Sequence, residues 1–548
     1  MWRSWAALAW NDHTVNRLQL SLAVLGMLLL GWGYWLAHSG RPDAHKKWRD
    51  RALAVLGLLG ALAYPNFGWL HFPNSNFVHA WDTYHYYLGA KYFPELGYEL
   101  LYDCTVVADA EAGGARLAHA KRRIITDLRT NEMVRTTEVL AHPERCKASF
   151  SPERWSAFEK DVDFFRARES TDRWEKIQHD HGYNATPVWT ALGYLLTNLG
   201  PASTPQVVAL NLFDPLYLML MALLVWWAFG WRVAAVAMLV FGTHFPNRFY
   251  WTGGAFLRHD WLFYLVACVC LLKKERFFLA GLSIAYATVL RLFPAFVVVG
   301  PAFAAVDVLW RERRVDRRWL TFFAGGALGV LLLSTLAAPL SGGFSTYRAF
   351  AKNTSKHANT PLTNHMGLRT ALSYRPSTIG ALMRDGKTFD PWKKWKDARL
   401  EAFHSALPLY VAIALGFAVL LYFAIRGAGN EPWMAAALST GMIAVGAELT
   451  CYYYGFVVAI ATLWLKKREV GLLLLTLCGV THFIHWAPFP NMSGWDDEKY
   501  VAMSFAALVA FGGVMWAFTP HAEKYCLPEE GLALTPAAPV TKTRTNER

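Results

Sequence analysis

Apolar residues occur along the chain in thirteen blocks, most of which have the length of a membrane-crossing helix. Such a helix needs about 17–25 predominantly apolar residues. The blocks between 277 and 310 are interrupted by Arg291 and Pro294. We therefore predict an all-α polytopic membrane protein with about 13 transmembrane helices, within a range of 11–13. The predicted spans are 18–37, 52–70, 207–230, 232–248, 256–272, 277–291, 293–310, 319–338, 405–425, 433–447, 453–466, 470–487 and 500–518.

Lysine and arginine gather in four short turns, at 38–51, after 272, at 311–318 and after 465. Short loops with many basic residues stay on the cytoplasmic side of a membrane. Thirteen spans with the N-terminus outside place all four turns on that side. The predicted order is an extracytoplasmic N-terminus at 1–17, helices at 18–70, an extracytoplasmic loop subdomain at 71–204, helices at 205–338, a basic extracytoplasmic loop at 339–404, helices at 405–518 and a disordered cytoplasmic tail at 519–548.

The composition fits a membrane protein, because 54% of the residues are hydrophobic and only 17% are charged. This balance excludes disorder over most of the chain and disfavours a soluble enzyme. The net charge of +13 nevertheless needs an explanation. The cytoplasmic turns supply part of it. The rest lies in the loop 339–404, which has eleven basic and four acidic residues, whereas the loop 71–204 has fifteen and eighteen.

The basic loop 339–404 has two interpretations. It is either a solvated face near lipid headgroups, or a cradle for phosphate or pyrophosphate. Either one accounts for the charge without nucleic acid, so no nucleic-acid partner is expected. The loop 71–204 contains two of the seven cysteines, Cys104 and Cys146. An oxidising compartment would allow them to pair, but the sequence leaves the pairing open.

The strongest candidate for chemistry lies at the entry to the first outer loop, in His79-Ala-Trp-Asp82-Thr-Tyr-His85-Tyr86. In a helix, Asp82, His85 and Tyr86 share one face. A carboxylate just outside the bilayer can accept a proton from an attacking hydroxyl group. The alternative is a structural acid at a helix N-terminus within an interfacial belt of aromatic residues.

A second cluster, Arg258-His259-Asp260, stands at the outer end of a span. Ionisable groups at membrane depth are costly unless they are paired or face a cavity. Arg258 and Asp260 are therefore either a structural pair or part of a site. Arg291, within another apolar run, either extends its charge to the interface or meets an anion.

Further polar residues are expected on the same outer face. Asn364, His365 and Arg369 lie in the basic loop, where an amide, an imidazole and a guanidinium suit phosphate or sugar hydroxyls. Glu448 and Lys499 lie at the outer ends of later spans. An acidic triplet, Asp496-Asp497-Glu498, precedes Lys499 and either binds a cation or is solvated. The shared outer position supports a site more strongly than any single cluster does.

The order of these features resembles the GT-C superfamily of integral membrane glycosyltransferases, and is most similar to mannosyltransferase-like bacterial enzymes that use polyprenyl-phosphate sugars. The likeness extends from about 52 to 500. Two departures are an extra span before Asp82 and a large insertion at 100–180, which would set acceptor choice. The resemblance is carried by Asp82 at the start of the first outer loop, Tyr183 to Pro187 before an interfacial helix, Gly253 to Asp260 followed by Arg291 to Pro294, and Asn364 to Arg369.

The resemblance implies an inverting transfer on the extracytoplasmic face of a bacterial inner membrane. The donor would be a polyprenyl-phosphate-linked sugar, and the acceptor a lipid or glycan. Asp82 would be the general base, while Arg291, Arg369 and Arg258 would stabilise the departing phosphate. No cofactor is implied, and no metal signature appears that would indicate a divalent cation. The remaining residues of the binding site would be His85, His259, Asp260, Asn364, His365, Glu448 and Lys499.

Two other classes of function remain open. A transporter or flippase for an anionic lipid or solute also needs buried Arg and Asp residues. No internal repeat is evident between the two halves of the chain, which disfavours this class. The third class is a non-catalytic membrane assembly protein.

Overall fold

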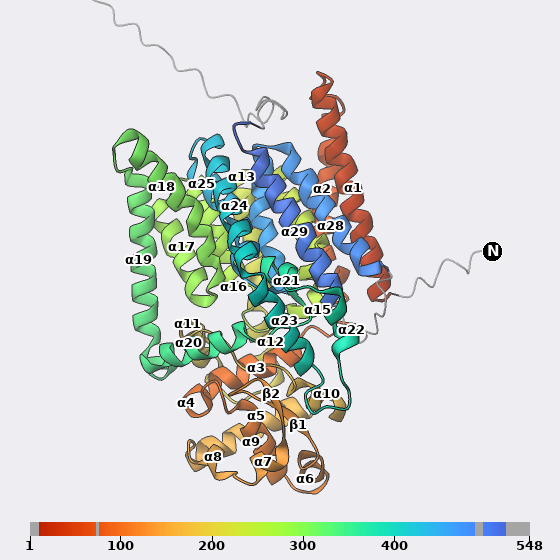
Figure 1. Cartoon of the computed structure of the whole chain (residues 1–548), viewed down its shortest axis with the longest axis vertical. Coiled ribbons are helices and arrows are strands. Elements are labelled where there is room, and N and C mark those ends of the chain that lie inside the picture. Colours follow the sequence, from red (N-terminus) through yellow and green to blue (C-terminus); the bar gives the residue numbers. More distant parts are fainter. Residues whose placement is uncertain (1–9, 73–75, 488–496, 522–548) are drawn as a thin grey trace, which may run out of the picture.

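The computed structural model describes residues 10–72, 76–487 and 497–521, and this part of the chain is mostly helical. A bundle of long helices occupies one half of the molecule, and a smaller subdomain of short helices adjoins one end of it (Figure 1). Strands are few: β1 Ile124–Asp127 pairs with β2 Glu132–Arg135, and β3 His365–Met366 pairs with β4 Leu449–Thr450, both antiparallel.

Seven helical stretches in the described residues are long and apolar enough to cross a membrane. Several turn large apolar side chains outward, such as Leu331 in α19 and Leu415 in α24. These features confirm the prediction of an all-α membrane protein. The stretches are α1 Asp12–His38, α12–α13 Thr204–Phe229, η3–α18 Phe293–Glu312, α19 Arg317–Ala337, α24 Leu407–Gly427, α28 Arg468–Trp486 and α29 Asp497–Ala517.

Other apolar helices of the bundle are shorter than the sequence predicts. In the predicted span 52–70 the helix already ends at Ala63. In the predicted span 256–272 the helix begins only at Asp260. Ten of the thirteen residues of α14 are buried, so neighbouring helices cover it on most sides. A helix packed inside protein need not match the bilayer thickness. These helices are α2 Lys46–Ala63, α14 Trp231–Thr243, α16 Asp260–Lys273, α17 Phe277–Leu290, α25 Pro432–Ser439, α26 Ile443–Gly446 and α27 Val457–Ala461.

The four basic turns gather at the end of the bundle remote from the subdomain. Lys273 is near enough to Lys466 for their charges to interact. Arg318 interacts in the same way with Glu275, in the turn that follows Lys273. Asp43, between α1 and α2, is near Arg468. Figure 1 shows the α18–α19 turn at this end, with the subdomain at the other.

The two long segments that the sequence predicts as outer loops, 71–204 and 339–404, fold largely into short helices. The first carries α3 Ala80–Lys91, α4 Phe93–Leu96, α5 Leu101–Glu111, α6 Gly114–Ala120, α7 Thr136–Leu140, α8 Glu144–Lys147, α9 Pro152–Arg166, α10 Thr171–Ile177 and α11 Pro187–Thr197. The second carries η4 Pro339–Ser341, α20 Ser345–Ala358, α21 Leu368–Leu372, α22 Gly380–Met383 and α23 Lys393–Ser405.

A disulfide joins Cys104 in α5 to Cys146 in α8, which answers the question that the sequence leaves open. Both cysteines are buried. The bond closes a loop across a sequence separation of 42 residues, which includes β1 and β2. It therefore restrains the part of the subdomain farthest from the bundle.

Replacement of both Cys104 and Cys146 by alanine is expected to destabilise this subdomain. A loop of this length contributes about 4 kcal/mol to the free energy of unfolding in the chain-entropy description. Thermal unfolding of the purified protein, followed by tryptophan fluorescence, would show a lower midpoint in the variant. A reducing agent would lower the midpoint of the wild type and leave that of the variant unchanged. Equal midpoints for both proteins would contradict the prediction.

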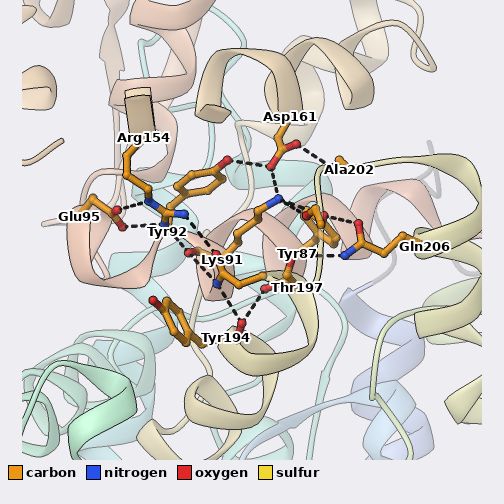
Figure 2. Close-up of polar contacts among 12 residues, drawn as sticks. Tyr87, Lys91, Tyr92, Glu95, Arg154, Asp161, Tyr194, Thr197, Ala202 and Gln206 are labelled. Atoms are coloured by element: carbon orange, nitrogen blue, oxygen red, sulfur yellow. Dashed lines mark hydrogen bonds and ion pairs between the residues drawn. The ribbon is translucent and has the colours of Figure 1, made fainter. Parts of the chain in front are cut away.

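The end of α3 is fixed by a buried network between α3, α9 and the residues before α12 (Figure 2). Lys91 Nζ lies 2.7 Å from Asp161 Oδ2. Tyr92 donates its hydroxyl to the same oxygen at 2.7 Å, and the Ala202 N–H donates to Asp161 Oδ1 at 2.7 Å. The guanidinium of Arg154 donates to the carbonyl of Lys91 at 2.8 Å. A buried, fully paired network of this kind holds α3 in one position.

Candidate functional site

The site begins where the entry to the first outer loop meets the segment before α16. Gly254 has a φ of +66°, and a Cβ atom there would lie only 1.9 Å from the carbonyl oxygen of Phe77. This contact requires glycine. His79, at the N-cap of α3, donates its N–H to the Gly254 carbonyl at 2.9 Å. The start of α3 therefore lies against the residues that lead into Arg258.

Asp82 and Arg258 form an ion pair across this contact, with 3.2 Å between Asp82 Oδ2 and Arg258 Nε. Asp82 is in the first turn of α3, as the predicted helix requires, and its side chain is 14% exposed. The Arg258 guanidinium lies 4.4 Å from the centre of the Tyr86 ring, on the same helix face as Asp82. Arg258 therefore pairs with Asp82, and a structural Arg258–Asp260 pair is not what the structure contains.

Arg291 approaches the same tyrosine from the end of α17. Its guanidinium lies 5.6 Å from the Tyr86 ring centre. Only 7% of the residue is exposed, so the side chain does not extend its charge to the interface. One nitrogen, Nη1, donates to the Leu290 carbonyl at 3.3 Å. Two arginines from different spans thus converge on one aromatic ring beside Asp82.

Several polar atoms at this point have no hydrogen-bond partner among the described residues. They are Arg258 Nη1, Arg291 Nε and Nη2, Asp260 Oδ2 and Asp82 Oδ2. Asp260 is fully buried, and its other oxygen accepts the Trp261 N–H at 2.7 Å. Leaving buried polar groups unpaired is costly, so native structures rarely contain them. Unpaired guanidinium nitrogens are suited to an anion that donates no hydrogen bond.

Neither a family model, nor a curated protein, nor a solved structure matches this chain. The chemistry of the site must therefore be argued from its own geometry. A carboxylate, two guanidinium groups and tyrosine hydroxyls can accept one proton and bind one anionic group.

Asp214, in α13, holds the Arg258 segment in place, although it is not among the residues predicted from the sequence. Its Oδ1 accepts the N–H groups of Arg258 at 2.7 Å and His259 at 3.0 Å. Its Oδ2 lies 2.7 Å from His259 Nδ1, and the other ring nitrogen lies 2.9 Å from the Tyr64 hydroxyl. His259 therefore has no free ring nitrogen for a ligand. The sequence signal that could have identified Asp214 is a lone carboxylate within an apolar run.

His85 also supports the structure around the site, because both of its ring nitrogens contact other residues of the protein. Its Nδ1 lies 2.9 Å from the Trp81 carbonyl, and its Nε2 lies 2.6 Å from the Tyr102 hydroxyl in α5. Burial lowers the pKa of His85, so the ring is neutral near pH 7. Asp180 accepts the Trp81 indole N–H at 2.7 Å, while His179 turns away to the Ile124 carbonyl at 3.0 Å. His179 and His181 therefore do not share a ligand site.

The predicted residues of the basic loop form a separate cluster around Glu448, built by the β3–β4 pairing. Glu448 Oε2 lies 3.7 Å from His365 Nδ1 and 3.5 Å from Arg369 Nε. The Thr370 hydroxyl donates to Glu448 Oε1 at 2.8 Å. Burial acts to raise the pKa of Glu448, but these partners outweigh it and lower the pKa to about 2. Asn364 contributes its backbone carbonyl, which accepts the Cys451 N–H at 2.9 Å.

Arg369 is therefore paired with Glu448 and, unlike Arg258 and Arg291, has no buried nitrogen without a hydrogen-bond partner among the described residues. Besides Glu448 it contacts the Ala358 carbonyl, to which it donates at 2.6 Å, and its guanidinium lies 4.4 Å from the Phe403 ring centre. These contacts hold the second outer loop onto the bundle. They do not bring Arg369 into contact with Asp82.

Asp497, one member of the acidic triplet, fits neither interpretation of that triplet. Asp497 is buried and accepts the Gly380 N–H at 3.1 Å and the Trp395 indole N–H at 2.9 Å. It is therefore neither solvated nor arranged as a cation ligand. Lys499 lies in the first turn of α29, where its charge interacts with His485. Asp496 belongs to the segment 488–496, outside the described residues.

Two further tyrosines complete the surroundings of Arg258. Its Nη2 donates to the Tyr452 hydroxyl at 3.3 Å, and the Tyr453 ring centre lies 5.9 Å from its guanidinium carbon. Both belong to η7 Cys451–Phe456, which follows β4. The consecutive tyrosines at an outer span end were visible in the sequence. Their contact with Arg258 was not, because it depends on how α16 and η7 pack.

Proposed function

We propose that the protein is an integral membrane glycosyltransferase that moves a sugar from a polyprenyl-phosphate donor to an acceptor hydroxyl, with inversion. The observation that carries this proposal is the pair of buried arginines with unpaired nitrogens beside Asp82. The oxygens of a phosphate leaving group can accept hydrogen bonds from both guanidinium groups, and the carboxylate of Asp82 can act as the base. The GT-C-like order of the motifs supports the same reaction.

The proposed step is a single displacement. The acceptor oxygen forms a bond to the anomeric carbon of the sugar as the bond from that carbon to the phosphate oxygen breaks. The acceptor proton passes to the Asp82 carboxylate, whose Oδ2 lies in the ion pair with Arg258. Arg258 Nη1 and the two free nitrogens of Arg291 donate to the departing phosphate. Donors already in place for the developing charge are the largest help that such a site can give.

We also propose the topology of thirteen spans, with the N-terminus outside and the C-terminus in the cytoplasm. Support comes from the gathering of four basic turns at the end of the bundle remote from Asp82. By the positive-inside rule this end is cytoplasmic, and the site is extracytoplasmic. The membrane would be a bacterial inner membrane, in line with the resemblance of the motifs.

The proposal is tested with the full chain in vesicles that contain a labelled polyprenyl-phosphate hexose and a panel of saccharide acceptors. Formation of a labelled glycoside, with release of polyprenyl phosphate, supports a transferase. Movement of the labelled lipid between leaflets, with no glycoside formed, supports a flippase instead and overturns the proposal. A glycoside that retains the anomeric configuration of the donor would overturn the single displacement.

As the pH is lowered, the rate of transfer is expected to fall at a higher pH than it would if the base were an exposed aspartate. Burial raises the pKa of Asp82, although Arg258, His85 and Arg291 oppose the shift and Asp180 adds to it. The base is active only when ionised, so activity is present above this pKa and is lost below it. The acid limb of a plot of kcat/KM against pH would give the pH at which this activity is lost. An acid limb at or below pH 4 would contradict the prediction.

A further inference from the structure

A cavity of about 520 Å³ lies between the two outer loops, apart from the arginines of the proposed reaction centre. One wall is formed by α4 and the residues that follow it, including Tyr98 and Glu99, together with Arg129 after β1. The opposite wall is formed by η4 and α20. This volume is within the range of small-molecule sites in proteins.

Helix α20 turns one face toward this cavity. Ser345, Ala349, Lys352 and Lys356 all line it, and their spacing of four, three and four residues places them on one side of the helix. Asn353 lies beside Lys352 on the same wall. The face therefore presents two ammonium groups, an amide and a hydroxyl to one space.

One of these groups lacks a partner that its burial calls for, and another is not in an ion pair. Asn353 is only 5% exposed, and its Nδ2 has no hydrogen-bond partner among the described residues. Lys356 donates to the Leu128 carbonyl, but the described part of the chain places no carboxylate within ion-pair distance of it. Lys352, by contrast, is paired with Glu99 at 3.2 Å. The charges of Glu99 and Asp127 act on Lys356 without forming an ion pair with it. A buried amide without a partner and two ammonium groups on one cavity wall suit a polar, anionic ligand.

We propose that this cavity binds the acceptor, and that the acceptor is a saccharide with an acidic group, either a carboxylate or a phosphate. Asn353 donates to a sugar hydroxyl, and Lys356 binds the acidic group. Phe93 and Tyr98 supply ring surface on the opposite wall. The assignment of this ligand as the acceptor rests on the proposed glycosyl transfer. The inference that the cavity binds an acidic saccharide does not depend on that transfer.

Aromatic rings connect the cavity with the reaction centre. The Tyr98 ring stacks on Tyr183 with 6.1 Å between their centres, and Tyr183 lies 5.7 Å from Tyr86. Tyr86 is the ring on which both arginines converge. Three successive rings, Tyr98, Tyr183 and Tyr86, therefore connect the cavity with the two arginines, so the cavity would hold a part of the acceptor that does not itself react. Binding energy from such a remote part can position the reacting hydroxyl.

The test is binding of three disaccharides of matched size to the full chain in nanodiscs, measured by saturation-transfer NMR and competition. The probes are a uronic-acid disaccharide, maltose 1-phosphate and neutral maltose. The variants are Asn353→Leu, which removes the amide, and Lys356→Gln, which removes the positive charge, each at similar volume. The matched control is Lys387→Gln, an exposed lysine of the same outer loop that does not line the cavity.

Wild type and Lys387→Gln are expected to bind one or both acidic probes at least about tenfold more tightly than maltose, since one lost ionic hydrogen bond costs about this factor. The two acidic probes distinguish a carboxylate from a phosphate. Both cavity variants are expected to lose about tenfold for the preferred probe. Equal binding of all three probes, no binding of any at millimolar concentration, or unchanged binding in both variants would overturn the proposal.

The Asp82→Asn variant separates this inference from the proposed function. It is expected to bind the acidic probe as the wild type does, because Asp82 does not line the cavity. If the probe binds and no glycoside forms in any assay, the cavity is a binding site and the transferase proposal fails. If glycosides form while the cavity variants bind and transfer normally, the acceptor site lies elsewhere.

Discussion

Replacement of Asp82 by asparagine is expected to reduce glycosyl transfer by about 10³-fold, within the 10²–10⁴-fold range of general base catalysis. The amide keeps the shape of the side chain but cannot accept the acceptor proton. Donor binding is expected to persist or tighten, because the change releases Arg258 from its ion pair at 3.2 Å. The measurement is kcat for glycoside formation, beside the affinity for polyprenyl phosphate.

The matched control for this variant is Asp172→Asn, an exposed carboxylate in α10 whose ion pair with Lys176 is also exposed. It is expected to leave both quantities unchanged, since such pairs contribute little. Full activity of Asp82→Asn would remove this residue from the role of base. Loss of donor binding along with turnover would show that Asp82 supports the structure of the site instead.

Replacement of Arg291 by methionine is expected to separate stability from activity. Removal of a preorganised donor to a developing anion costs about 10²–10³-fold in kcat. The protein without ligand is nevertheless expected to gain stability, because a buried guanidinium with two unpaired nitrogens is replaced by an apolar side chain. Thermal unfolding in detergent would show a higher midpoint, and affinity for polyprenyl phosphate would fall.

Arg317→Met is the control, since this arginine is exposed at the opposite end of the bundle. It is expected to change neither the unfolding midpoint nor the turnover. A lower midpoint with intact transfer in Arg291→Met would identify Arg291 as a structural residue. Addition of polyprenyl phosphate should raise the midpoint of the wild type and leave that of the Arg291 variant unchanged.

Residue spacing and hydropathy were sufficient to predict the parts of the site that depend only on residues close together in the sequence. The helix that carries Asp82 and Tyr86 on one face follows from residue spacing, and the burial cost of Arg258 and Arg291 follows from the apolar runs around them. The partner of Arg258 does not follow from such rules. Asp260 is the acid nearest to Arg258 in the sequence, but the partner of Arg258 is Asp82. The contact of Gly254 with Phe77 places Asp82 beside Arg258.

The same limit applies to the second cluster and to the inner helices. His365 and Arg369 look like ligand-binding residues until β3 pairs with β4 and brings Glu448 to them. Hydropathy also cannot distinguish a helix that faces lipid from one that is packed inside protein. The predicted span 232–248 is therefore longer than α14, which ends at Thr243 and is mostly buried.

The proposed proton acceptor and the arginines proposed to bind the leaving group belong to different parts of the molecule. Asp82 is carried by the outer subdomain, whose α3 is fixed by the network around Lys91 and Asp161, while Arg258 and Arg291 lie at the ends of bundle helices. The two halves of the proposed reaction are thus encoded in separable stretches of sequence. Changes in the outer loops can diversify the acceptor while the leaving-group chemistry is inherited intact, provided that the few contacts joining the two modules are kept.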